Sequence, residues 1–433
     1  MRDDWKECKL GDLLKLKNGY AFKSSNYINE GTPVIRIGDI NDWIVDETKA
    51  KCVSEKKEYD DYVVEKDDIL IAMSGATTGK FGIYHSDNKA YQNQRVGNLK
   101  PHSKVLTDKK FIYFLLYSLK YQIEKDAYGG AQPNISSGKI EALKTMLAPL
   151  PEQRTIVAKI EELFSSLDSG IADLKKAQDQ LKIYRKALLN KSFDSIKEYI
   201  PLNDCGLWKG GGTPSLQVKE YWENGNIPWV SSRDVKTKDI FDTERHITEI
   251  AIPNSSTKWI DKEAILFVVR SGILRRIFPI AIAKSNLCVN QDIQTLTLDE
   301  RFYSEYIYWF LVGKESNIRH TCSKDGTTVE SIDSAKLKSY KIPNCSLKEQ
   351  HQIVQEIESR LSVCDKVEES IVESLEKSKA LRQSILKKAF EGKLLNDAEI
   401  ASCKSEADYE PANVLLERIK KAAVKKSKIE ANG

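Results

Sequence analysis

Apolar and small side chains recur at helical spacing in two long stretches of the chain. The first stretch runs from residue 150 to about 193 and carries Ile156, Ile160, Leu163, Leu167, Ile171, Leu174, Ala177, Leu181, Tyr184 and Leu188. The second carries Ile353, Ile357, Leu361, Cys364, Val367, Ile371, Leu375, Ser378, Leu381 and Ile385. In each stretch a mean spacing of about 3.6 residues predicts a long helix that packs against one partner along a narrow seam.

Each predicted helix has a start signal in the sequence. Pro151 suits a first helical turn, and Ser346 with Glu349 has the spacing of a capping box. At about 1.5 Å per residue each helix would be roughly 60 Å long, which is too long for a core helix of a small domain. Because the long segment between them lets the chain return, we expect the two helices to pair antiparallel as a coiled coil with a globular head at each end.

The chain also repeats itself with a period of about 197 residues. The stretch LPEQRTIVAKIEELF at Leu150 returns as LKEQHQIVQEIESRL at Leu347. Fainter matches lie upstream, and they pair PVIRIGDI with PWVSSRDV, Ser74-Gly75 with Ser271-Gly272, Asn93-Gln94 with Asn290-Gln291, and FIYFLL with YIYWFL. A duplication whose helices stayed alike while its heads diverged suggests one scaffold carrying two heads of separate specificity.

Outside the long helices the pattern is mixed. Short apolar runs such as Ile69 to Ala72 and Ala264 to Val269 alternate with Gly, Asn and Asp turns, and each head has one helical stretch, Lys109 to Lys125 or Ser304 to Lys314. We therefore predict an α+β fold with two mixed α/β globular domains in tandem, separated by the two long helices. The predicted segments are a first head (1–149), a central helix (150–198), a second head (199–345), a distal helix (346–395) and a tail with a short basic helix (396–433).

Composition places the chain among globular proteins. With 433 residues, of which 41% are hydrophobic and 30% charged, it can form the cores of two or three domains. The longest apolar runs are far below the roughly 20 residues that span a bilayer, and the N-terminus lacks a signal peptide's apolar segment, so we expect a cytoplasmic protein with no membrane contact. Eight cysteines without a CxxC pair favour reduced, structural thiols. A net charge of +4 allows nucleic acid as a partner without arguing for it.

Catalytic motifs are mostly absent from the sequence. Gly75 to Phe81 resembles a phosphate-binding loop, but it is one residue short and has Phe81 where Ser or Thr must reach the metal. No GxGxxG follows a predicted strand, and there is no GxSxG, HExxH or Asn/Asp-Pro-Pro-aromatic tetrapeptide. The five histidines are scattered, and the ExK triplets are those expected by chance in a chain rich in Lys and Glu. We therefore predict a non-catalytic protein that itself binds no cofactor or metal.

Polar, turn-rich segments of both heads carry side chains suited to nucleic acid. Arg, Asn and Gln can pair bidentately with guanine or adenine, while Lys and Arg also contact phosphate, which positions a protein without reading sequence. The candidates in the first head are Lys23, Arg36, Ser74, Gly75, Thr77, Thr78, Lys80, Asn93, Gln94 and Arg95. The candidates in the second head are Lys209, Arg233, Arg270, Ser271, Arg275, Arg276, Asn290 and Gln291. Ordinary surface loops are the alternative interpretation, and composition alone favours that alternative.

The repeated helices carry a resemblance that covers essentially the whole chain. LPEQRTIVAKIEELF, LRQSILKKAFEGKLL, the loop SGATTGKFG and the LLERIK tail look like the specificity (S) subunits of Type I restriction-modification systems, the HsdS family. The resemblance implies two target recognition domains, each reading one half of a split site in double-stranded DNA, and paired helices that set the spacing and bind two modification subunits. Two heads that read different half-sites should not keep identical loops, so the divergence of the loop at Arg270 from the loop at Ser74 fits this interpretation.

The resemblance also assigns the chemistry to partner subunits. Modification (M) subunits would bind S-adenosylmethionine and methylate adenine, and restriction (R) subunits would use ATP and Mg²⁺ to cleave or translocate DNA. The competing hypothesis is a bridging coiled-coil scaffold whose heads bind proteins without sequence-specific DNA contact. The basic helix of the tail is either a solvated segment or a docking segment for a partner or for DNA backbone.

Overall fold

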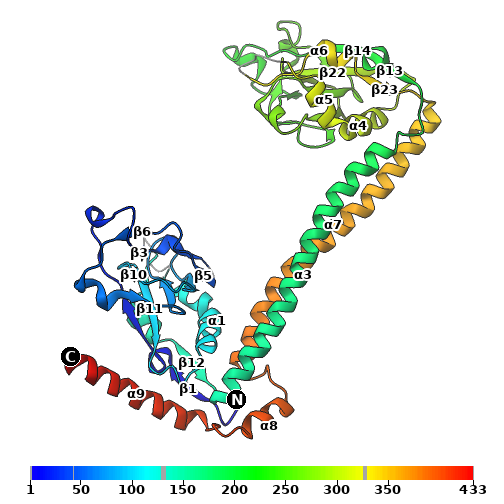
Figure 1. Ribbon diagram of the computed structural model, residues 1–433. Helices are drawn as coiled ribbons and strands as arrows, with labels where there is room; N and C mark the ends of the chain where they lie inside the picture. The colour runs from blue at the N-terminus through cyan, green and yellow to red at the C-terminus, as the bar shows by residue number, and fades with distance from the viewer. Residues whose placement is uncertain (1, 42, 128–132, 325–328, 433) are drawn as a thin grey trace. The chain divides into compact units, whose positions relative to one another are not determined.

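The chain divides into two units, each with its own head (Figure 1). The computed structural model describes residues 2–41, 43–127, 133–324 and 329–432, and the side chains of residues 426–432 lie outside this description. Unit 1 comprises Met1–Ala172 and Leu375–Gly433, and unit 2 comprises Asp173–Ser374. Each unit therefore holds one head and part of both long helices, and unit 1 also holds the tail.

The first head contains three sheets. The smallest pairs β1 (Lys6–Lys9) with β12 (Lys144–Leu147). A six-stranded sheet has the order β2 (Leu14–Asn18), β11 (Val96–Pro101), β8 (Ile69–Ala72), β9 (Phe81–Ile83), β5 (Trp43–Val45) and β4 (Ile40–Asn41). A four-stranded sheet has the order β6 (Lys51–Val53), β3 (Thr32–Ile35), β10 (Ala90–Gln92) and β7 (Val63–Val64). Two helices, α1 (Lys109–Ala127) and α2 (Ser137–Glu141), complete the head.

The second head repeats this topology. Its small sheet pairs β13 (Tyr199–Pro201) with β23 (Lys341–Pro343). Its largest sheet has the order β14 (Gly206–Gly210), β22 (Ile293–Leu298), β19 (Ile265–Val268), β20 (Ile280–Ala283) and β16 (Asp239–Ile240). Its third sheet has the order β17 (His246–Ile247), β15 (Ile227–Val230), β21 (Leu287–Val289) and β18 (Trp259–Ile260). The helices are α4 (Ser304–Gly313), α5 (Glu315–Thr321) and α6 (Ser334–Lys338).

The equal strand order in the two heads shows that the sequence repeat is a structural duplication. The pairs β2·β11·β8·β9·β5 and β14·β22·β19·β20·β16 match position by position, as do the two four-stranded sheets. Within the described residues, only β4 of the first head has no strand counterpart in the second. The predicted α+β fold with two tandem mixed domains and two long helices is confirmed.

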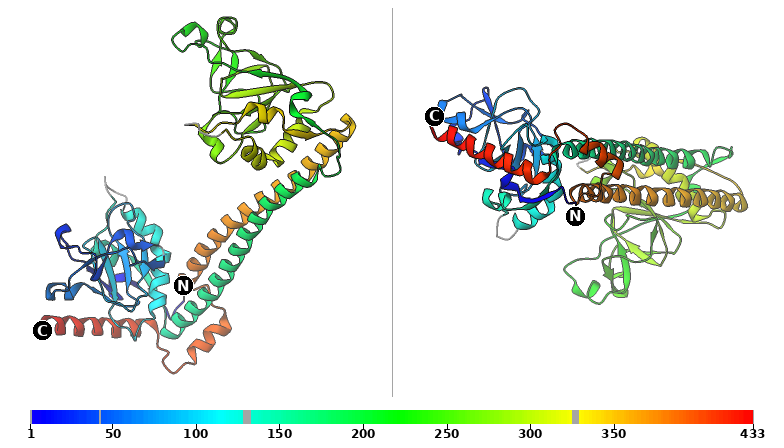
Figure 2. Two further views of the ribbon diagram at one scale, coloured as in Figure 1. Left: turned by 45° about the horizontal axis from the view of Figure 1, so that its top comes forward. Right: turned by 90° about the horizontal axis from the view of Figure 1, so that it is seen from below.

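The long helices α3 (Leu150–Lys191) and α7 (Leu347–Phe390) lie side by side and antiparallel (Figures 1 and 2). In unit 1 the start of α3 and the end of α7 share one buried cluster, which includes Ile160 and Leu386. In unit 2 the end of α3 and the start of α7 share another, which includes Leu189 and Ile357. Three predicted seam positions are exposed instead, namely Tyr184, Val367 and Leu381. An α-helix drifts by about 20° per heptad from a strict 3.5-residue repeat, so positions at the border of the seam rotate out of it.

The predicted capping box at the start of α7 is present. Glu349 Oε2 accepts hydrogen bonds from the Ser346 backbone N–H (2.9 Å) and hydroxyl (2.6 Å), and the Glu349 N–H donates to Ser346 Oγ (3.4 Å). These bonds satisfy donors that the first turn of a helix otherwise leaves free. The box therefore sets where α7 begins.

A buried glutamine ties each long helix to the head that precedes it. Gln153 Oε1 accepts the Asp108 N–H at the start of α1 (3.0 Å), and its amide donates to Ala148 O just before α3 (2.8 Å). Gln350 Oε1 likewise accepts the Tyr303 N–H just before α4 (2.9 Å), and its amide donates to Cys345 O (2.9 Å). Both glutamines are fully buried. The same side chain therefore makes the same two-way bridge in both copies.

The tail is packed onto unit 1 through its first part. After α7 come α8 (Asp397–Lys404) and α9 (Ala412–Asn432). Arg154 of α3 donates two hydrogen bonds to Asp408 (2.8 and 2.9 Å), and Lys159 donates two to Glu399 (2.6 and 2.8 Å). On α9 the side chains of Ala412, Leu415, Leu416 and Ile419 are buried in the core of the unit. The interpretation of the tail as wholly solvated is therefore wrong for the residues up to Ile419, because the apolar face of α9 is part of that core.

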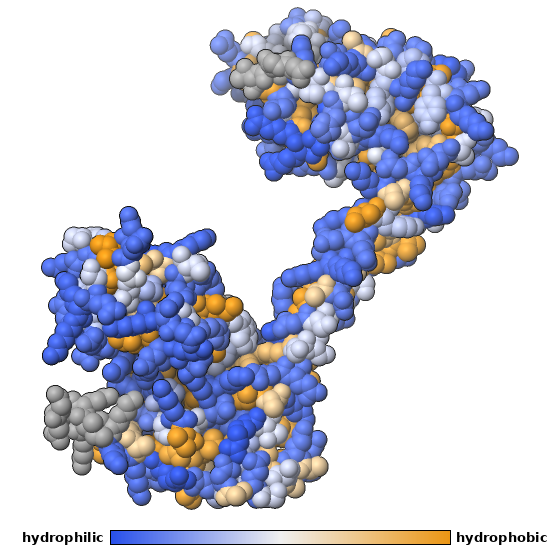
Figure 3. Space-filling view, viewed as in Figure 1, coloured by the Kyte–Doolittle hydropathy of each residue, from blue (hydrophilic) through white to orange (hydrophobic). Residues whose placement is uncertain are grey.

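Two further predictions concern thiols and membranes. All eight cysteines are free, and six of them are buried. Within the described residues, none of the helices combines the length and apolar character needed to cross a membrane. Hydrophilic side chains cover most of the face seen in Figure 3.

Replacing Gln350 with leucine should destabilise unit 2. The substitution leaves the Tyr303 N–H and the Cys345 carbonyl without their partner in a buried site, which costs about 1–3 kcal/mol. Gln352→Leu is the matched control, because Gln352 lies on the same helix and is exposed. Denaturant unfolding should show a lower free energy of unfolding for Gln350→Leu alone; equal stability of the two variants would contradict the bridging role.

The carboxylates that hold the tail have lowered pKa values. The hydrogen bond from Arg154 holds the pKa of Asp408 below its ordinary value, and the hydrogen bond from Lys159 does the same for Glu399. A carboxyl group whose pKa is lower in the folded state stabilises that state above its unfolded pKa and loses this contribution as pH falls through the folded pKa. Acid should therefore release α8 from α3.

Lowering the pH from neutrality to below about 4, the ordinary pKa of a carboxyl group, should raise amide hydrogen exchange in α8. The amides of strand β8 should respond only at a lower pH. Lys159→Gln should raise exchange in α8 already at neutral pH, since it removes the donor to Glu399 of that helix. Arg360→Gln is the control, because the partners of Arg360, Glu356 and Tyr184, belong to unit 2 and not to the tail. Exchange in α8 that is the same for all three proteins at every pH would refute the assignment.

Candidate nucleic-acid interface

In each head the two central strands of the four-stranded sheet are parallel, so their carboxyl ends meet at one edge. In the first head β3 and β10 pair through Val34 and Tyr91, and in the second β15 and β21 pair through Trp229 and Cys288. The residues that follow these strands must therefore lie close together. The Asn93 N–H donates to Ile35 O (2.9 Å), and the Asn290 N–H donates to Val230 O (2.9 Å). The predicted Asn-Gln turns thus stand beside the turns that contain Arg36 and Ser231.

Two glycines let the chain pass close to this edge. A Cβ on Gly19 would lie 2.1 Å from Asn93 O, and a Cβ on Gly211 would lie 2.2 Å from Val289 O and 2.3 Å from Asn290 O. No side chain fits at such distances, so glycine is required at both places. Gly211 and its neighbour Gly212, whose Cβ would lie 2.2 Å from Ser256 Oγ, thus have a structural reason, whereas a Cβ on Gly210 would meet open space.

The loops that follow β8 and β19 join the same edges. In the first head the Met73 N–H donates to Arg95 O (2.9 Å), the Gly75 N–H to Pro133 O (3.0 Å) and the Thr77 hydroxyl to Ile37 O (3.2 Å). In the second head the Val269 N–H donates to Asp292 O (2.8 Å) and the Ser271 N–H to Glu330 O (3.1 Å). We call residues 36–39, 74–80 and 93–95 the first turn edge, and residues 231–234, 269–276 and 290–292 the second.

The shared hydrogen bonds correct the alignment of the two loops by one residue. Met73 occupies the place of Val269, so Ser74 corresponds to Arg270 and Gly75 to Ser271. The match of Ser74-Gly75 with Ser271-Gly272 was therefore wrong, because it followed the two letters and not the backbone pairing. By the same bonds Arg95 corresponds to Asp292. The two edges thus share a backbone frame and differ in the charge of their side chains.

The first turn edge presents a mixture of open and engaged side chains. Gln94 and Arg95 are exposed, and within the described residues their side chains have no hydrogen-bond or ion-pair partner. Arg36 is half-buried, with Nε 3.6 Å from Asp39 Oδ2. Thr78 is buried, and its hydroxyl donates to Gly75 O (2.6 Å), so it stabilises the loop and is unsuited to a direct DNA contact.

Three other candidates of the first head lie around this edge. Lys80 follows the loop directly before β9 and is partly exposed, and Asn93 is partly exposed beside it in the second turn. Lys23 is exposed in the segment after Tyr20, whose backbone pairs with Asn93. The structure thus brings the first head's candidates to one region, with Thr78 turned inward.

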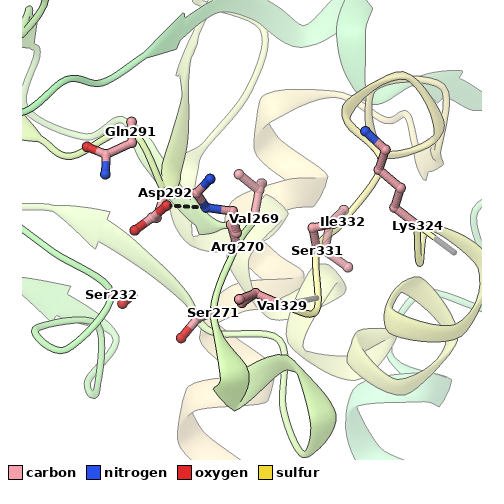
Figure 4. Close-up of a pocket in the computed structure, with 10 residues that line it drawn as sticks. All are labelled: Ser232, Val269, Arg270, Ser271, Gln291, Asp292, Lys324, Val329, Ser331 and Ile332. Atoms are coloured by element: carbon pink, nitrogen blue, oxygen red, sulfur yellow. Dashed lines mark hydrogen bonds and ion pairs between the residues drawn. The ribbon is translucent and has the colours of Figure 1, made fainter. Parts of the chain in front are cut away.

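The second turn edge encloses a pocket of about 750 Å³ (Figure 4). Three predicted residues, Arg270, Ser271 and Gln291, contribute to its wall. Ser232 and Lys324, which are not among the predicted residues, also line it. Ser232 could have been found as the repeat partner of Ile37 in the matched turns, whereas nothing in the sequence marked Lys324.

Charged side chains within the second edge are paired. The Arg270 Nε–H donates to Asp292 Oδ1 (2.7 Å), and Asn290, which is buried, donates from its amide to Asp292 Oδ2 (3.2 Å). The Arg275 Nε–H donates to Glu330 Oε1 (2.6 Å), and this bond holds the pKa of Glu330 below its ordinary value. These carboxylates orient the arginines that they bind.

The remaining candidates of the second head differ in where they lie. Arg233 and Arg276 are exposed, and their side chains have no partner among the residues that the structure describes. Lys209 is placed elsewhere, since its Nζ donates to Asp261 Oδ2 (3.1 Å) and Trp259 O (3.2 Å) and does not line the pocket. Lys209 was predicted as a phosphate contact from its charge, which does not show which strand end a side chain faces.

The chemistry of both edges is that of hydrogen bonding and charge. Exposed Arg and Gln side chains can meet base edges, and the surrounding cations can meet phosphate. Within the described part of the chain, no group of three or more His, Cys, Asp and Glu side chains is placed to hold a metal ion.

Comparisons with known proteins agree with this geometry. The family model described as Type I restriction modification DNA specificity domain matches twice, over residues 2–177 and 197–377. The specificity subunit of the Type I restriction enzyme EcoR124I/EcoR124II from Escherichia coli is 31% identical, over 74% of this chain and 78% of the relative. The EcoBI specificity subunit of Escherichia coli is 24% identical, over 97% of this chain and 92% of the relative.

Solved structures share the fold. A chain from a structure described as the basis of complex assembly and conformational transition of the Type I R-M system superposes with a TM-score of 0.71 at 17% identity, covering 91% of this chain and 99% of that one. The HsdS subunit from Thermoanaerobacter tengcongensis gives a TM-score of 0.62 at 16% identity, covering 91% and 98%. At these identities the similarity establishes the fold alone.

Proposed function

The chain belongs to the DNA specificity subunits of Type I restriction-modification systems, and we propose that each of its heads reads one half of a split DNA site. The resemblance drawn from the sequence is confirmed, and so is the role of a specificity subunit. The relatives are named specificity subunits, which also confirms the prediction of a non-catalytic subunit. Family membership favours this function over the bridging scaffold without DNA contact.

The observation that carries the proposal is the matched backbone of the two turn edges. The same backbone hydrogen bonds hold both edges, but the side chains at equivalent places differ. Ser74 of the first edge corresponds to Arg270 of the second, and Arg95 corresponds to Asp292. Loops that merely closed a fold would have no reason to keep the frame and exchange charges. Two frames with unlike donors and acceptors suit two different half-sites.

The long helices suit the role of a spacer between the half-sites. A helix of 42 residues, as in α3, is about 63 Å long at about 1.5 Å per residue. Two heads carried by such a pair would read elements separated by a segment of unread duplex, whose length follows from the helices. Phosphate contacts from the cations of each edge would add affinity that falls with salt.

Two equivalent grooves beside the long helices support a partner that binds twice. The groove of unit 1, about 530 Å³, is lined by Trp43, Phe114, Glu161, Phe164, Ser165, Asp168 and Arg382. The groove of unit 2, about 520 Å³, is lined by Arg185, Leu189, Trp309, Val312, Glu358, Leu361, Ser362 and Asp365. We call them the first and second helix grooves.

The two helix grooves have identical side chains at several equivalent positions, whereas several charged side chains of the two turn edges differ. Glu161, Ser165 and Asp168 of the first groove correspond in the repeat to Glu358, Ser362 and Asp365 of the second. An arginine of the other long helix closes each groove, since Arg382 pairs with Asp168, and Arg185 pairs with Asp365 (2.7 Å). Equal surfaces in both units suit two copies of one partner, which we assign to two modification subunits.

The other partners follow from the family. Restriction subunits would join the assembly, S-adenosylmethionine would bind to the modification subunits, and ATP and Mg²⁺ would serve the restriction subunits. Double-stranded DNA would be the ligand of this chain, and the cytoplasm its location. The target base must leave the stack for methylation, so the bound duplex is expected to be deformed.

Co-expression with the modification subunit should produce N6-methyladenine at one split motif in a host genome, as mapped by long-read sequencing. Seven residues inserted into both α3 and α7 keep the hydrophobic seam in register, so this variant should change only the length of the unread spacer. Seven residues inserted into α3 alone is the control and should abolish the motif. A methylated motif whose spacer ignores the double insertion would refute the spacer role, and no motif from an intact complex would refute the DNA-reading function.

Ser165→Arg should reduce the number of bound modification subunits from two to one, because a long cation blocks the first helix groove without touching the second. Ser165 is exposed on α3 and lines that groove, whereas the neighbouring Ser166 is exposed and does not, so Ser166→Arg is the matched control. Native mass spectrometry of the co-expressed complex measures the stoichiometry. Two subunits bound to Ser165→Arg would contradict this docking surface.

A further inference from the structure

Arg270 is held by a carboxylate that is itself anchored to the sheet. Its Nε–H donates to Asp292 Oδ1 (2.7 Å), as Figure 4 shows. Asp292 receives a second hydrogen bond at Oδ2 from the Asn290 amide (3.2 Å), and its backbone N–H donates to Asn290 Oδ1 (3.1 Å). Asn290 is only 6% exposed, and its N–H is bonded to Val230 O at the end of β15. The strand pair thus fixes the carboxylate, and the carboxylate fixes the guanidinium.

The brace leaves one side of the guanidinium open. Within the described residues Asp292 is the only partner of the Arg270 side chain, which is 58% exposed. Because Asp292 binds Nε, the two terminal nitrogens of the guanidinium are left as a pair of neighbouring donors at the wall of the pocket. An arginine already held in one orientation loses less side-chain entropy on binding than a free one.

A fork of two donors selects one base. Guanine presents two acceptors, N7 and O6, in the major groove, and this pair fits the two terminal nitrogens of an arginine. Adenine presents one acceptor and one amino donor there, which would oppose an arginine donor. A good bidentate pair of this kind discriminates against a wrong base by a factor of about ten or more.

The first head lacks this arrangement. Its residues at the two equivalent places are Ser74 and Arg95, so neither a carboxylate brace nor an arginine at the first place is present. The cation is instead on the turn that follows β10, where Arg95 is exposed. The two heads therefore carry an arginine at different places of matching frames.

We propose that Arg270, oriented by Asp292, reads a guanine in the half-site bound by the second head, and that the positions 270 and 292, with their counterparts 74 and 95, are specificity determinants of the two heads. The proposal rests on the proposed function. Arg270 contacts the base, and Asp292 is a positioning residue that acts through it.

The test uses the complex of the full chain with its modification subunit. The genome-wide methylation motif of the unaltered complex should contain a guanine in one half-site that becomes degenerate in Arg270→Ala. Asp292→Asn keeps the shape and removes the charge, so it should relax the same base position to a smaller degree. Lys219→Ala removes an exposed cation of the same head that lies outside the second turn edge and does not line the pocket, and its motif should be unchanged.

Binding measurements with altered DNA give a second readout. Replacing that guanine by 7-deazaguanine removes the N7 acceptor alone, so it should weaken binding of the unaltered complex by about tenfold. The same replacement should have no effect on the Arg270→Ala complex. Variants that copurify with the modification subunit and still methylate through the first half-site exclude misfolding as the cause.

The outcomes separate the two levels of the argument. No methylated motif from the unaltered complex would overturn the proposed function and this inference with it. A split motif that stays the same in Arg270→Ala, or that loses specificity at a base other than guanine, would overturn the inference and leave the proposed function standing.

Discussion

The structure depends on one buried amide at each junction between a head and a long helix. An amide side chain both donates and accepts, so Gln153 and Gln350 each satisfy an N–H before the head's helix and a carbonyl before the long helix. A buried apolar side chain would leave both groups without partners, at a cost that a folded domain cannot easily absorb. Each long helix therefore leaves its own head in a direction that the head determines, and a pair of heads can be carried by one pair of helices.

The duplication separates what must stay from what can change. The junction glutamines, the seam and the helix grooves occur twice with the same or similar side chains. The packing of each unit requires the first two, and the partner proposed to bind twice would require the third. The turn edges keep their backbone bonds, the Asn-Gln pair and the aspartate at Asp39 and Asp234. They exchange a neutral side chain for a cation at Ser74 and Arg270, and a cation for an anion at Arg95 and Asp292. Loops anchored by backbone bonds to strand ends tolerate such exchanges, since no core contact depends on the side chain.

The sequence predicted the periodic parts and missed those made by distant contacts. The start of the helix at Leu347 and the strand Ile69–Ala72 were predicted closely, because capping and hydrophobic periodicity are local, whereas that helix ends at Phe390 and not at residue 395. The bond between Met73 and Arg95 joins separate loops, and only it shows that Ser74 corresponds to Arg270. Burial of Thr78 and of the tail's Leu415 likewise follows from what packs against them, which charge and composition do not encode. The candidate site was thus predicted as a set of loops, and the structure supplied the order among its side chains.

The brace on Arg270 shows how specificity can change without a change of fold. Asp292 is held by Asn290, and Asn290 is held by the end of a strand that is paired in the same way in both heads. Exchanging the two side chains of such a pair alters the donors and acceptors that meet a base, but it leaves the strand pairing, the junction glutamine and the seam untouched. On the proposed function, stability and sequence recognition reside in different residues of the same head, and a new half-site would require only that the second set change.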